Sequence, residues 1–593
     1  MSAPAVALEE EAVLGVRRSL RGQRWLARDG DARVGMALAQ RLELPEIVGR
    51  VLAARGVGLD EAEAFLEPTL KALLPDPSRL RDMDRAAARL ARAVEGGEAI
   101  AVFGDYDVDG ATSAAILARF FAAVGCPIRV YVPDRLREGY GPNAAALMRL
   151  RAEGVRVVVT VDCGTTAHDA LEVAAEAGLD VIVVDHHVVE PRLPPCFAVI
   201  NPNRLDEDGS LGQLAAVGVA FLLAVAVNRA LRAAGHYRHR PEPDLKHLLD
   251  LVALGTVCDM VPLVGLNRAF VRQGLKVMAG RRNAGLAALA DLARVSEAPN
   301  AYHLGFIIGP RVNAGGRVGK SDLGARLLST GDAVEAAELA RRLDAHNQER
   351  KALEREVLDA ARHEAEAADA GAPLIFVAGE GWHPGVIGIV AGRLVERFHR
   401  PACVVALDGA EGKGSGRSVA GVDLGAAVIA ARQAGLLTAG GGHPMAAGFT
   451  VARAQLGELV QFLAERVAAA MRAVVPTLSL DGAMTVGGAD LGLVTALERL
   501  APFGAGNAEP RFALPAARLV RADVVGDGHV RGVLADGGGG RLKAIAFRAA
   551  GEPMGEALMN AQGRPLHLAG RVRRDTWRGG SAVQFMIDDA AWP

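Results

Sequence analysis

The chain has 593 residues, which is too many for one hydrophobic core, so three or four domains are expected. Its hydrophobic fraction of 50% and charged fraction of 23% are those of an ordinary soluble globular protein. The net charge of -2 lacks the strongly basic balance of many nucleic-acid-binding proteins, although carboxylates in a site can mask a locally basic groove.

The five cysteines are scattered without a CxxC pair, which argues against a disulfide framework and a structural zinc site. The N-terminus lacks the basic-then-apolar order of a signal peptide. The longest uncharged apolar run, residues 214–227, is too short to cross a bilayer. We therefore expect a cytoplasmic protein that does not interact with membranes.

In chain order, residues 1–95 predict an N-terminal helical segment that packs on the domain following it. That domain, residues 96–330, begins with continuous apolar strands that alternate with helices. Such alternation indicates an α/β fold with a parallel sheet covered on both faces. The expected strands are residues 99–104, 127–132, 155–162, 180–185 and 197–200.

The rest of the chain predicts three further parts. Residues 331–370 contain mostly good helix formers and predict a long, mostly exposed helix that joins two domains; a coiled-coil partner helix is the alternative. Residues 371–470 predict a smaller α/β domain. Residues 471–593 alternate short strands with glycine turns, which favours a small β-barrel of the OB-fold type.

Acidic and imidazole side chains stand where the apolar strands end. Asp105, Asp107 and Asp109 follow the first strand. Asp162 ends another strand, and Asp185-His186-His187 ends the next, while Asp259 lies at the end of an apolar helix. Because ligands bind beyond the carboxyl ends of parallel strands, we expect the strand-end groups to meet at one edge.

This set of side chains predicts a divalent metal site. A single aspartate after a strand is commonly a helix N-cap, and a single histidine is more often structural than a ligand. Together, carboxylates and imidazoles without thiolates suit Mn²⁺ or Mg²⁺. Several bridging aspartates suit two ions roughly 3.5–4 Å apart, the arrangement used for hydrolysis of phosphoesters.

Four motifs, GDYDVDG, VDCGTT, VVDHH and TVCDMVPL, occur in the order found in the DHH phosphoesterase superfamily, which the chain resembles. The resemblance implies that Asp107, Asp109, Asp162, His186 and Asp259 are metal ligands, with Asp105 as an addition whose direct contact is left open. It places His187 beside the scissile phosphate as a polariser or proton donor, with His186 and Asp162 as the other catalytic residues.

Motifs in the second α/β region, GPRVNAGGRVG, GWHPGVIGIVAGR, GSGRS and GGGHPMAAG, resemble the DHHA1 domain and its approach. Arginines can fork onto phosphate oxygens, and glycine-rich turns let backbone N–H groups approach an anion. A flexible turn is the alternative for GGGH. The expected phosphate and nucleic-acid contacts are Arg311, Asn313, Arg317, His383, Ser415, Arg417, Ser418, Gly441, Gly442 and His443.

The segment APFGAGNAEPRF resembles the one that precedes the OB-fold in the single-strand-specific exonuclease branch of this superfamily, and the resemblance covers nearly the whole chain. It implies a 5′→3′ exonuclease that hydrolyses single-stranded DNA to 5′-mononucleotides with two Mn²⁺ or Mg²⁺ ions. DNA repair and recombination, a monomer, and single-strand-binding protein and repair helicases as partners are further expectations of the resemblance.

Two alternatives stay open at this point. One is a phosphodiesterase for short RNA or (cyclic) dinucleotides, and the other is a non-catalytic DNA-binding scaffold related to the exonuclease branch. The OB-like region opposes the first, and the complete set of acidic and histidine positions opposes the second. Its weakly indicated DNA contacts are Arg573, Arg574, Trp577 and Arg578, within a wider basic set of Arg518, Arg521, Arg531, Arg541, Arg548 and Arg571.

Overall fold

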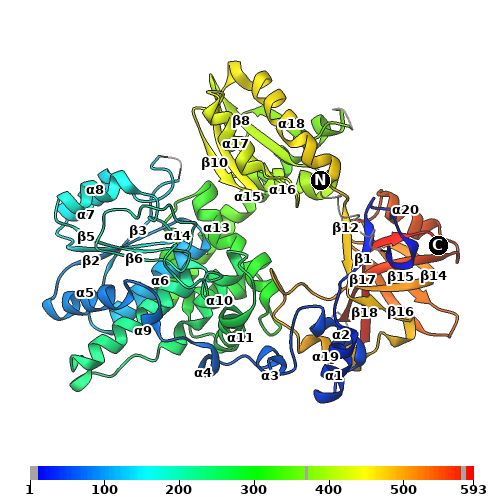
Figure 1. Cartoon of the computed structure of the whole chain (residues 1–593), viewed down its shortest axis with the longest axis horizontal. Coiled ribbons are helices and arrows are strands. Elements are labelled where there is room, and N and C mark those ends of the chain that lie inside the picture. The colour runs from blue at the N-terminus through cyan, green and yellow to red at the C-terminus, as the bar shows by residue number, and fades with distance from the viewer. Residues whose placement is uncertain (1–10, 136, 368–370, 576–581) are drawn as a thin grey trace, which may run out of the picture. The chain divides into compact units, whose positions relative to one another are not determined.

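The computed structural model describes residues 11–135, 137–367, 371–575 and 582–593. The chain divides into two compact units (Figure 1). One contains the residues up to Ala72 together with those from Val475 onward, and the other contains Leu73–Val474. Each unit is described by itself below.

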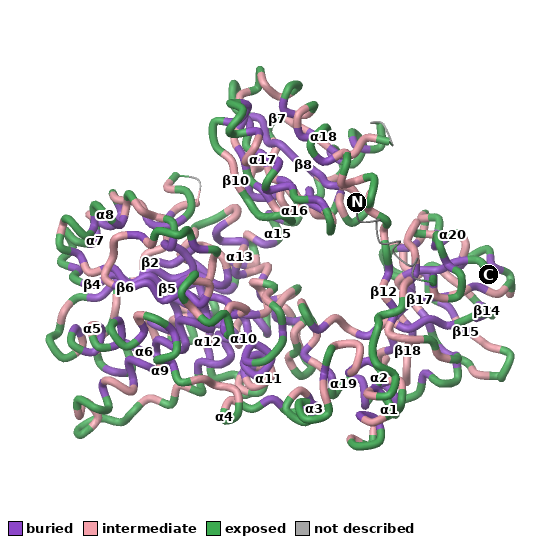
Figure 2. Tube along the Cα trace, in the orientation of Figure 1, coloured by how far each residue is buried: buried purple, intermediate pink, exposed green. Residues whose placement is uncertain are grey.

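A five-stranded parallel sheet forms the core of the larger unit, as the sequence predicts. The strand order is β3-β2-β4-β5-β6, and β2 and β4 are buried along their whole length (Figure 2). Burial on both faces explains their continuous apolar sequences. The strands are β2 (Ile100–Gly104), β3 (Arg129–Tyr131), β4 (Val157–Val161), β5 (Asp180–Val184) and β6 (Ala198–Ile200).

Helices cover both faces of this sheet (Figure 1). On one face α7 (Ala144–Ala152) and α8 (His168–Glu176) pack on β2, β4 and β5 through leucines such as Leu150 and Leu171. On the other face lie α5 (Met83–Gly96), α6 (Val108–Ala123) and α9 (Ala216–Ala233).

Helix α9 is long and apolar enough to cross a membrane by length and composition, but 72% of it is buried inside the protein. It packs against α5, α6 and α10 (Leu249–Cys258). Its apolar surface is therefore covered by the protein itself.

A helical region follows and leads into one long helix. Its elements are α10, α11 (Gly265–Ala279), α12 (Ala284–Leu292), the π-helix η5 (His303–Ile308), α13 (Gly309–Val318) and α14 (Leu323–Ser329). The expected long helix is present as α15 (Ala333–Ala367). It is less exposed than predicted, because its first half packs on α12, α13 and α14 and its second half on α16 and β7.

The second α/β region is built on a mixed sheet in the order β10-β11-β9-β8-β7. The GGGH motif lies on edge strand β10, which forms a hairpin with β11, so the alternative of a flexible turn there is wrong. The elements are β7 (Ile375–Glu380), α16 (Ile387–Phe398), β8 (Ala402–Asp408), β9 (Glu411–Arg417), α17 (Leu424–Gln433), β10 (Ala439–His443), β11 (Ala446–Ala452) and α18 (Leu456–Ala473).

The C-terminal residues form the predicted β-barrel, which closes through pairing of its first strand with β17. Strand β18 runs parallel to β16 and antiparallel to β17. The barrel consists of β14 (Phe512–Val525), β15 (His529–Ala535), β16 (Arg541–Ala546), β17 (Pro565–Asp575) and β18 (Ala582–Ala591), with α20 (Pro553–Asn560) before β17.

The N-terminal segment differs from its prediction. Strand β1 (Arg24–Ala27) pairs with β12 (Thr477–Leu480), and the buried Trp25 Nε1 donates to Asp589 Oδ2 at 2.9 Å. Helices α1 (Ala32–Arg41), α2 (Glu46–Ala53) and α3 (Ala62–Leu66) share a core with α19 (Leu491–Glu498) and the barrel. The residues up to Ala72 thus share a compact unit with the barrel, whereas η2 (Pro77–Arg79) and α5 pack on α9 of the larger unit.

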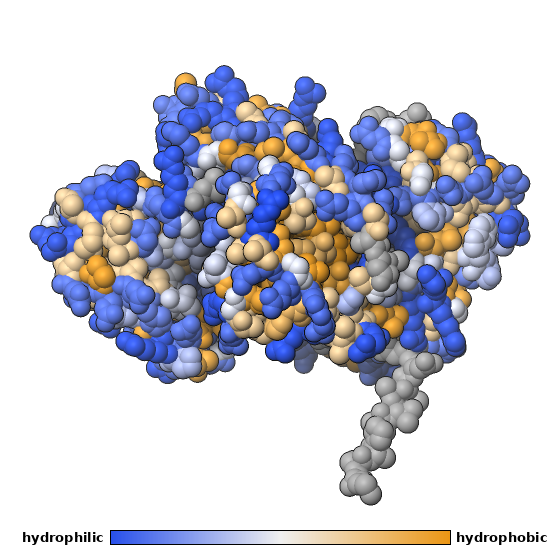
Figure 3. All heavy atoms as spheres, turned by 90° about the horizontal axis from the view of Figure 1, so that it is seen from above, coloured by the Kyte–Doolittle hydropathy of each residue, from blue (hydrophilic) through white to orange (hydrophobic). Residues whose placement is uncertain are grey.

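Apolar side chains remain on the surface in places. Figure 3 shows them gathered in patches among hydrophilic side chains on one face of the molecule. Scattered exposed apolar residues are normal, so only clusters that lie beside a functional group carry information.

Candidate metal centre

Strand register brings three aspartates into one row at the edge of the parallel sheet. Gly104 is paired with Val161, and Val161 with Val184. The next residue of each strand is Asp105, Asp162 or Asp185. This arrangement agrees with the prediction from the strand ends.

The backbone after β2 and β4 is shaped to keep these carboxylates close together. A Cβ on Gly110 would lie 2.5 Å from the Asp105 carbonyl oxygen, so only glycine fits where α6 begins. Asp162 has a φ of 61° and Gly164 a φ of 114°. A non-glycine residue in the left-handed region costs free energy, which other contacts of the site must offset.

Three overlapping groups of side chains could each hold a metal ion. Within each group the candidate ligand atoms lie within 4.8 Å of one another. Asp162 is common to two groups and His186 to two, so the groups form one continuous centre. They are Asp162/His186/His187, Asp109/His186/Asp259 and Asp105/Asp107/Asp162.

His186 lies in the middle of the carboxylates. Its Nε2 is 3.3 Å from Asp162 Oδ1, 3.6 Å from Asp259 Oδ2 and 3.9 Å from Asp109 Oδ2. Burial, followed by the neighbouring His187, lowers the pKa of His186 to about 4. The imidazole is therefore neutral near pH 7 and can ligate a metal.

Crowding raises the pKa of four of these carboxyl groups. For Asp105, Asp109 and Asp162, burial is the largest cause of the raised pKa and repulsion from Asp107 is the second. The pKa of Asp109 rises to about 7. Burial and repulsion by Asp109 raise the pKa of Asp259 to about 9. Like charges at this spacing favour protonation unless a cation neutralises them.

The donor set fits divalent cations. Among the buried side-chain atoms of the described residues that have no hydrogen-bond partner, three lie in this centre, namely Asp105 Oδ1, His186 Nε2 and Asp259 Oδ2. Buried polar atoms nearly always have a hydrogen-bond partner. Three atoms without one in a single centre therefore indicate that the centre binds a ligand. Oxygen and imidazole donors without thiolate suit Mn²⁺ or Mg²⁺.

Asp109 and Asp107 also serve the helices beside them. Asp109 Oδ2 accepts from the backbone N–H of Ala216 at 2.7 Å, and Oδ1 from Val217 at 2.9 Å, which orients the carboxylate at the N-terminus of α9. Asp107 Oδ1 accepts from Gly110 N at 3.0 Å and caps α6. Helix capping and metal ligation therefore do not exclude each other here.

The first residue of the DHH triplet has a positioning role. Asp185 Oδ1 accepts from His187 Nδ1 at 2.7 Å and from His186 N at 2.8 Å, while Oδ2 accepts from Thr165 Oγ1 at 2.7 Å. Despite burial, the hydrogen bond and charge of His187 and the Thr165 hydrogen bonds lower the pKa of Asp185. The pKa of His187 is raised overall. Burial alone would lower it, but the hydrogen bond and the charge of Asp185 are among the effects that together outweigh burial.

Arginines lie near the same centre. A Cβ on Gly316 would lie 2.8 Å from the Tyr106 carbonyl oxygen, so glycine lets α13 touch the loop between the carboxylates. The next residue, Arg317, donates to the Gly385 carbonyl oxygen at 3.0 Å. Burial, followed by Arg135, Arg350 and Arg417, lowers the pKa of Arg317 to about 10.

These mutually repelling cations are suited to a polyanion. Arg417 donates to Ser415 Oγ at 3.3 Å, and burial together with Arg135 lowers its pKa. Arg135 stacks over the Tyr106 ring, 5.0 Å from its centroid. Among the described residues no carboxylate forms an ion pair with Arg317, Arg417 or Arg135, so their charges are available to phosphate.

Other expected phosphate contacts have local partners instead. Arg311 pairs with Asp344 at 2.9 Å, and Ser418 Oγ donates to the Val422 carbonyl oxygen at 2.7 Å. His383 Nδ1 accepts from Gly385 N at 3.0 Å, which places it beside Arg317. Asn313 lies on α13, and Gly441, Gly442 and His443 lie on β10.

The weakly indicated arginines of the barrel have acidic partners. Arg573 forms an ion pair with Glu509, and Arg574 one with Glu498 at 2.7 Å. Arg571 likewise pairs with Asp588 at 2.7 Å. Acids on α19, on β18 and in the segment before β14 thus neutralise these arginines, and Trp577 and Arg578 lie outside the described residues.

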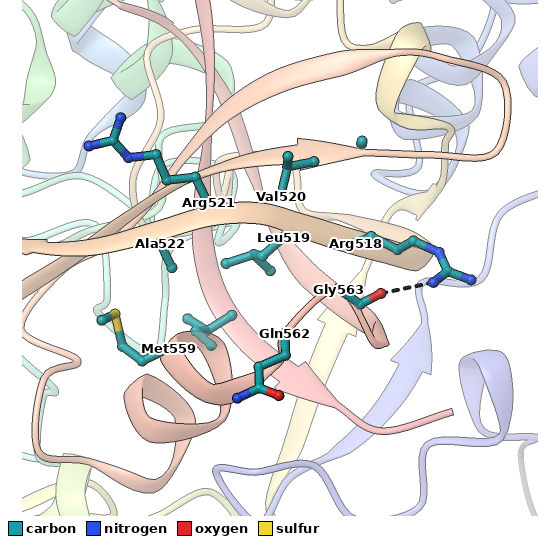
Figure 4. A pocket seen from close by; sticks show the side chains of 10 residues that line it. Arg518, Leu519, Val520, Arg521, Ala522, Met559, Gln562 and Gly563 are labelled. Atoms are coloured by element: carbon teal, nitrogen blue, oxygen red, sulfur yellow. Dashed lines mark hydrogen bonds between the residues drawn. The ribbon is translucent and has the colours of Figure 1, made fainter.

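Two other arginines of the barrel border a cavity of about 540 Å³ between β14 and α20 (Figure 4). Arg518 and Arg521 point away from each other at its two ends, with Val520 between them. Arg518 donates to the Gly563 carbonyl oxygen at 2.8 Å.

Several residues of the centre were not found from sequence. Tyr140 Oη donates to the Asp162 carbonyl oxygen at 3.0 Å and lies 3.4 Å from His187 Nδ1. Asn201 Nδ2 donates to the His187 carbonyl oxygen, and Asn203 Nδ2 to that of His186. Arg135 and Tyr140 lie on the loop after β3, where a strand-end search could have found them.

Family models match three parts of the chain. The N-terminal domain of the DHH family matches residues 99–256, the DHHA1 domain matches residues 371–469, and the RecJ OB domain matches residues 480–589. The single-stranded-DNA-specific exonuclease RecJ of Escherichia coli is 36% identical over 574 residues, which are 93% of this chain and 96% of that protein.

Solved structures agree with these matches. The crystal structure of RecJ from Thermus thermophilus in complex with Mn²⁺ has a TM-score of 0.78 and 32% identity, and the match covers 95% of this chain and 78% of that one. The same protein in complex with Mg²⁺ has a TM-score of 0.72 and 31% identity, with 95% and 77% covered. The solved relatives thus contain the ions that the donor set fits.

Proposed function

The chain belongs to the RecJ family of single-stranded-DNA-specific exonucleases, and we propose from this premise that it degrades single-stranded DNA from the 5′ end to 5′-mononucleotides. It is a metal-dependent single-stranded-DNA exonuclease. The observation that carries this function is the buried carboxylate-histidine centre, which has atoms without hydrogen-bond partners and lies near arginines that form no ion pair with a described carboxylate.

In this proposal Asp107, Asp109, Asp162, His186 and Asp259 hold two divalent ions, Mn²⁺ or Mg²⁺. Asp105 joins them, because its Oδ1 is buried, without a partner and grouped with Asp107 and Asp162. When bound, such ions polarise the phosphodiester, lower the pKa of water and stabilise the leaving oxygen. The overlap of the candidate groups at Asp162 supports a bridging position for that carboxylate.

His187 is the proton donor or polariser in the proposal. Asp185 Oδ1 lies 2.7 Å from His187 Nδ1, and this hydrogen bond directs His187 Nε2 away from Asp185. The Asp185 carboxylate also favours the charged imidazolium form of His187. An imidazolium can donate a proton to the leaving 3′-oxygen or stabilise charge on the phosphate. Arg317 and Arg417 bind phosphate oxygens on the opposite side.

Polarity is part of the proposal and is tested by end-labelling. Single-stranded oligonucleotides labelled at the 5′ or the 3′ end are incubated with Mn²⁺ or Mg²⁺, and the first labelled product is identified. Immediate release of a 5′-labelled mononucleotide supports the proposal. Release of label first from the 3′ end overturns the polarity, and equal degradation of duplex DNA overturns the single-strand preference.

A dinucleotide or short-RNA phosphodiesterase is the second candidate, since the catalytic pair of domains alone would suffice for it. The β-barrel favours a long strand, because OB barrels bind single strands along a groove. Turnover of a dinucleotide faster than that of a long oligonucleotide would favour the second candidate. Roles in repair and recombination, contacts with single-strand-binding protein and helicases, a monomeric state and a cytoplasmic location belong to the proposal as expectations.

A further inference from the structure

Two exposed aromatic rings stack on each other in the helical region of the larger unit. The ring centroids of Tyr302 and Phe306 are 5.3 Å apart, with an angle of 25° between the planes. Tyr302 is 55% exposed and Phe306 72% exposed. Large aromatic side chains usually gain their stability from burial, so a stacked exposed pair indicates a surface for binding.

Phe306 lies on the π-helix η5, which packs on the end of α10, and Tyr302 directly precedes that helix. The Cys258 thiol, one residue before the candidate ligand Asp259, donates to the Leu304 carbonyl oxygen at 3.5 Å. A Cβ on Gly309 would lie 2.4 Å from Cys258 Sγ, so the two segments are in close contact. The aromatic pair is thereby tied to the element that supplies one metal ligand.

A further exposed apolar side chain lies at this junction. Met260 follows Asp259, is 76% exposed and has a φ of 59°. A methionine in the left-handed region is uncommon and costs free energy, which suggests a functional constraint. Thioether and aromatic groups both make favourable contacts with flat π-systems.

The segment before η5 holds the pair in place. The buried His303 accepts from Asn300 N through Nδ1 at 3.1 Å, and its Nε2 lies 3.2 Å from Glu297 Oε1. Asn300 Oδ1 accepts from His303 N at 3.2 Å. Single π-helical turns inside helices occur frequently at functional sites, and this one is fixed at its start.

Helix α13 continues directly from η5 toward the arginines. From Phe306 to Gly316, which packs on Tyr106, is ten residues, or about 15 Å at 1.5 Å per residue. Stacked nucleotides rise about 3.4 Å each along one strand. The aromatic pair is therefore several nucleotide rises along this helix from Arg317, the residue proposed to bind phosphate.

We propose that Tyr302 and Phe306 form a base-stacking platform for single-stranded DNA, several nucleotides from the scissile phosphate. The proposal rests on the proposed single-stranded-DNA substrate. Stacking on an aromatic ring is independent of base identity, because every base has a π-face. The platform binds unpaired bases and cannot stack on bases that remain paired inside a duplex.

The test compares Phe306→Ala and Tyr302→Ala with wild-type protein on an oligonucleotide of about twenty nucleotides and on a dinucleotide. Loss of one stacking contact is expected to raise KM for the oligonucleotide about 5- to 30-fold, with kcat nearly unchanged. The dinucleotide does not reach the platform, so its kcat/KM is expected to stay within about twofold of wild type. Phe306→Trp keeps an aromatic ring and is expected to leave the KM for the oligonucleotide near the wild-type value. Phe306→Leu is expected to raise it as Phe306→Ala does.

An abasic-site scan identifies the contact itself. Moving one abasic nucleotide along the oligonucleotide raises the wild-type KM at one position and leaves the Phe306→Ala variant unaffected there. Val334→Ala is the control, because Val334 is 77% exposed and lies at the start of α15.

Unchanged KM in both alanine variants, or equal losses on the dinucleotide, overturns the platform. So does a lowered melting temperature with unchanged KM, which would make the pair structural. Wild-type protein that fails to degrade single-stranded DNA overturns the proposed function instead.

Discussion

Asp185 accepts a hydrogen bond from His187 Nδ1 at 2.7 Å, and both oxygens of Asp185 are occupied by protein donors. Asp185 also belongs to none of the candidate metal groups found among the described residues, so we expect this carboxylate to support the imidazole. In the proposed function the metal-facing group of the triplet is His186, whose Nε2 lies 3.3 Å from Asp162 Oδ1.

Asp185→Asn tests this relationship. The asparagine amide lacks the charge by which Asp185 raises the pKa of His187. We therefore expect kcat to fall about 10- to 100-fold, which is the usual effect of removing such a supporting carboxylate. The basic limb of the pH–rate profile, which reports loss of the imidazolium proton, is expected to move to lower pH.

Manganese content measured on purified protein should stay unchanged in this variant. Asp180→Asn is the matched control, because Asp180 begins the same strand β5 and pairs with Arg89. Loss of the metal in Asp185→Asn would contradict the supporting role and make Asp185 a ligand.

Metal-free protein is expected to lose stability as pH rises. Asp109 and Asp259 have pKa values raised to about 7 and about 9, above the value near 4 of unfolded chains. The folded state thus binds more protons than the unfolded state in this window, so the free energy of unfolding falls from pH 4 to pH 9. Melting temperatures in EDTA across this range measure the effect.

Added Mn²⁺ should remove most of that slope and raise the melting temperature, because the ions replace the protons. An Asp109→Asn/Asp259→Asn double variant should show a flatter profile in EDTA. A profile in EDTA that is flat for the wild type would refute the electrostatic account of the centre.

Gly316→Ala should separate α13 from the loop that carries Asp105 and Asp107. The added methyl group would lie 2.8 Å from the Tyr106 carbonyl oxygen and 3.1 Å from its Cβ. We expect a stability loss of about 1–3 kcal/mol from overpacking, and at least a tenfold lower kcat/KM because Arg317 is displaced. Urea unfolding and steady-state kinetics measure the two effects.

Gly392→Ala provides the comparison, since Gly392 lies inside α16 and a Cβ there meets nothing within 4 Å. Alanine should stabilise that helix by roughly 0.5–1 kcal/mol. If Gly316→Ala behaved like Gly392→Ala, the close approach of α13 would have no functional role.

Arg317→Ala should weaken binding of single-stranded DNA and reduce its salt dependence. Each phosphate contact on a single strand contributes about 0.7 to the slope of log K against log salt. Removing Arg317 should therefore lower the magnitude of that slope by about 0.7, as measured by fluorescence anisotropy over a salt series.

Arg573→Ala is the counterpart in the barrel. Glu509 already neutralises Arg573, so this variant should leave the slope within error of the wild type. A slope reduced as much by Arg573→Ala as by Arg317→Ala would show that the ion pair opens to bind DNA.

Sequence reasoning identified the metal centre because its chemistry is local. A buried strand has a readable apolar pattern, and the residue after it lies at a predictable edge of a parallel sheet. This is why Asp105 and Asp162 could be placed before the structure was known. The barrel could be predicted for a similar reason, since glycine turns between short strands are local signals.

Contacts between distant segments could not be predicted in the same way. Asp109 caps α9 about a hundred residues later, and the pairing of Arg573 with Glu509 depends on how β17 lies against the segment before β14. The N-terminal strand β1 pairs with β12, which no pattern within residues 1–95 reveals. Pairing across such separations is decided by which complementary edges and charges meet after collapse.

By itself, the sequence determined the elements, the strand-end acids and the family, since these depend on neighbours along the chain. Only the tertiary structure decided which charges stay free for substrate. Arg317 and Arg417 are half-buried and have no acidic partner in the described part of the chain, whereas Arg311, Arg573 and Arg574 are neutralised. The physical reason is that an arginine's availability depends on whether a carboxylate lies within about 4 Å in space, which spacing in sequence does not encode.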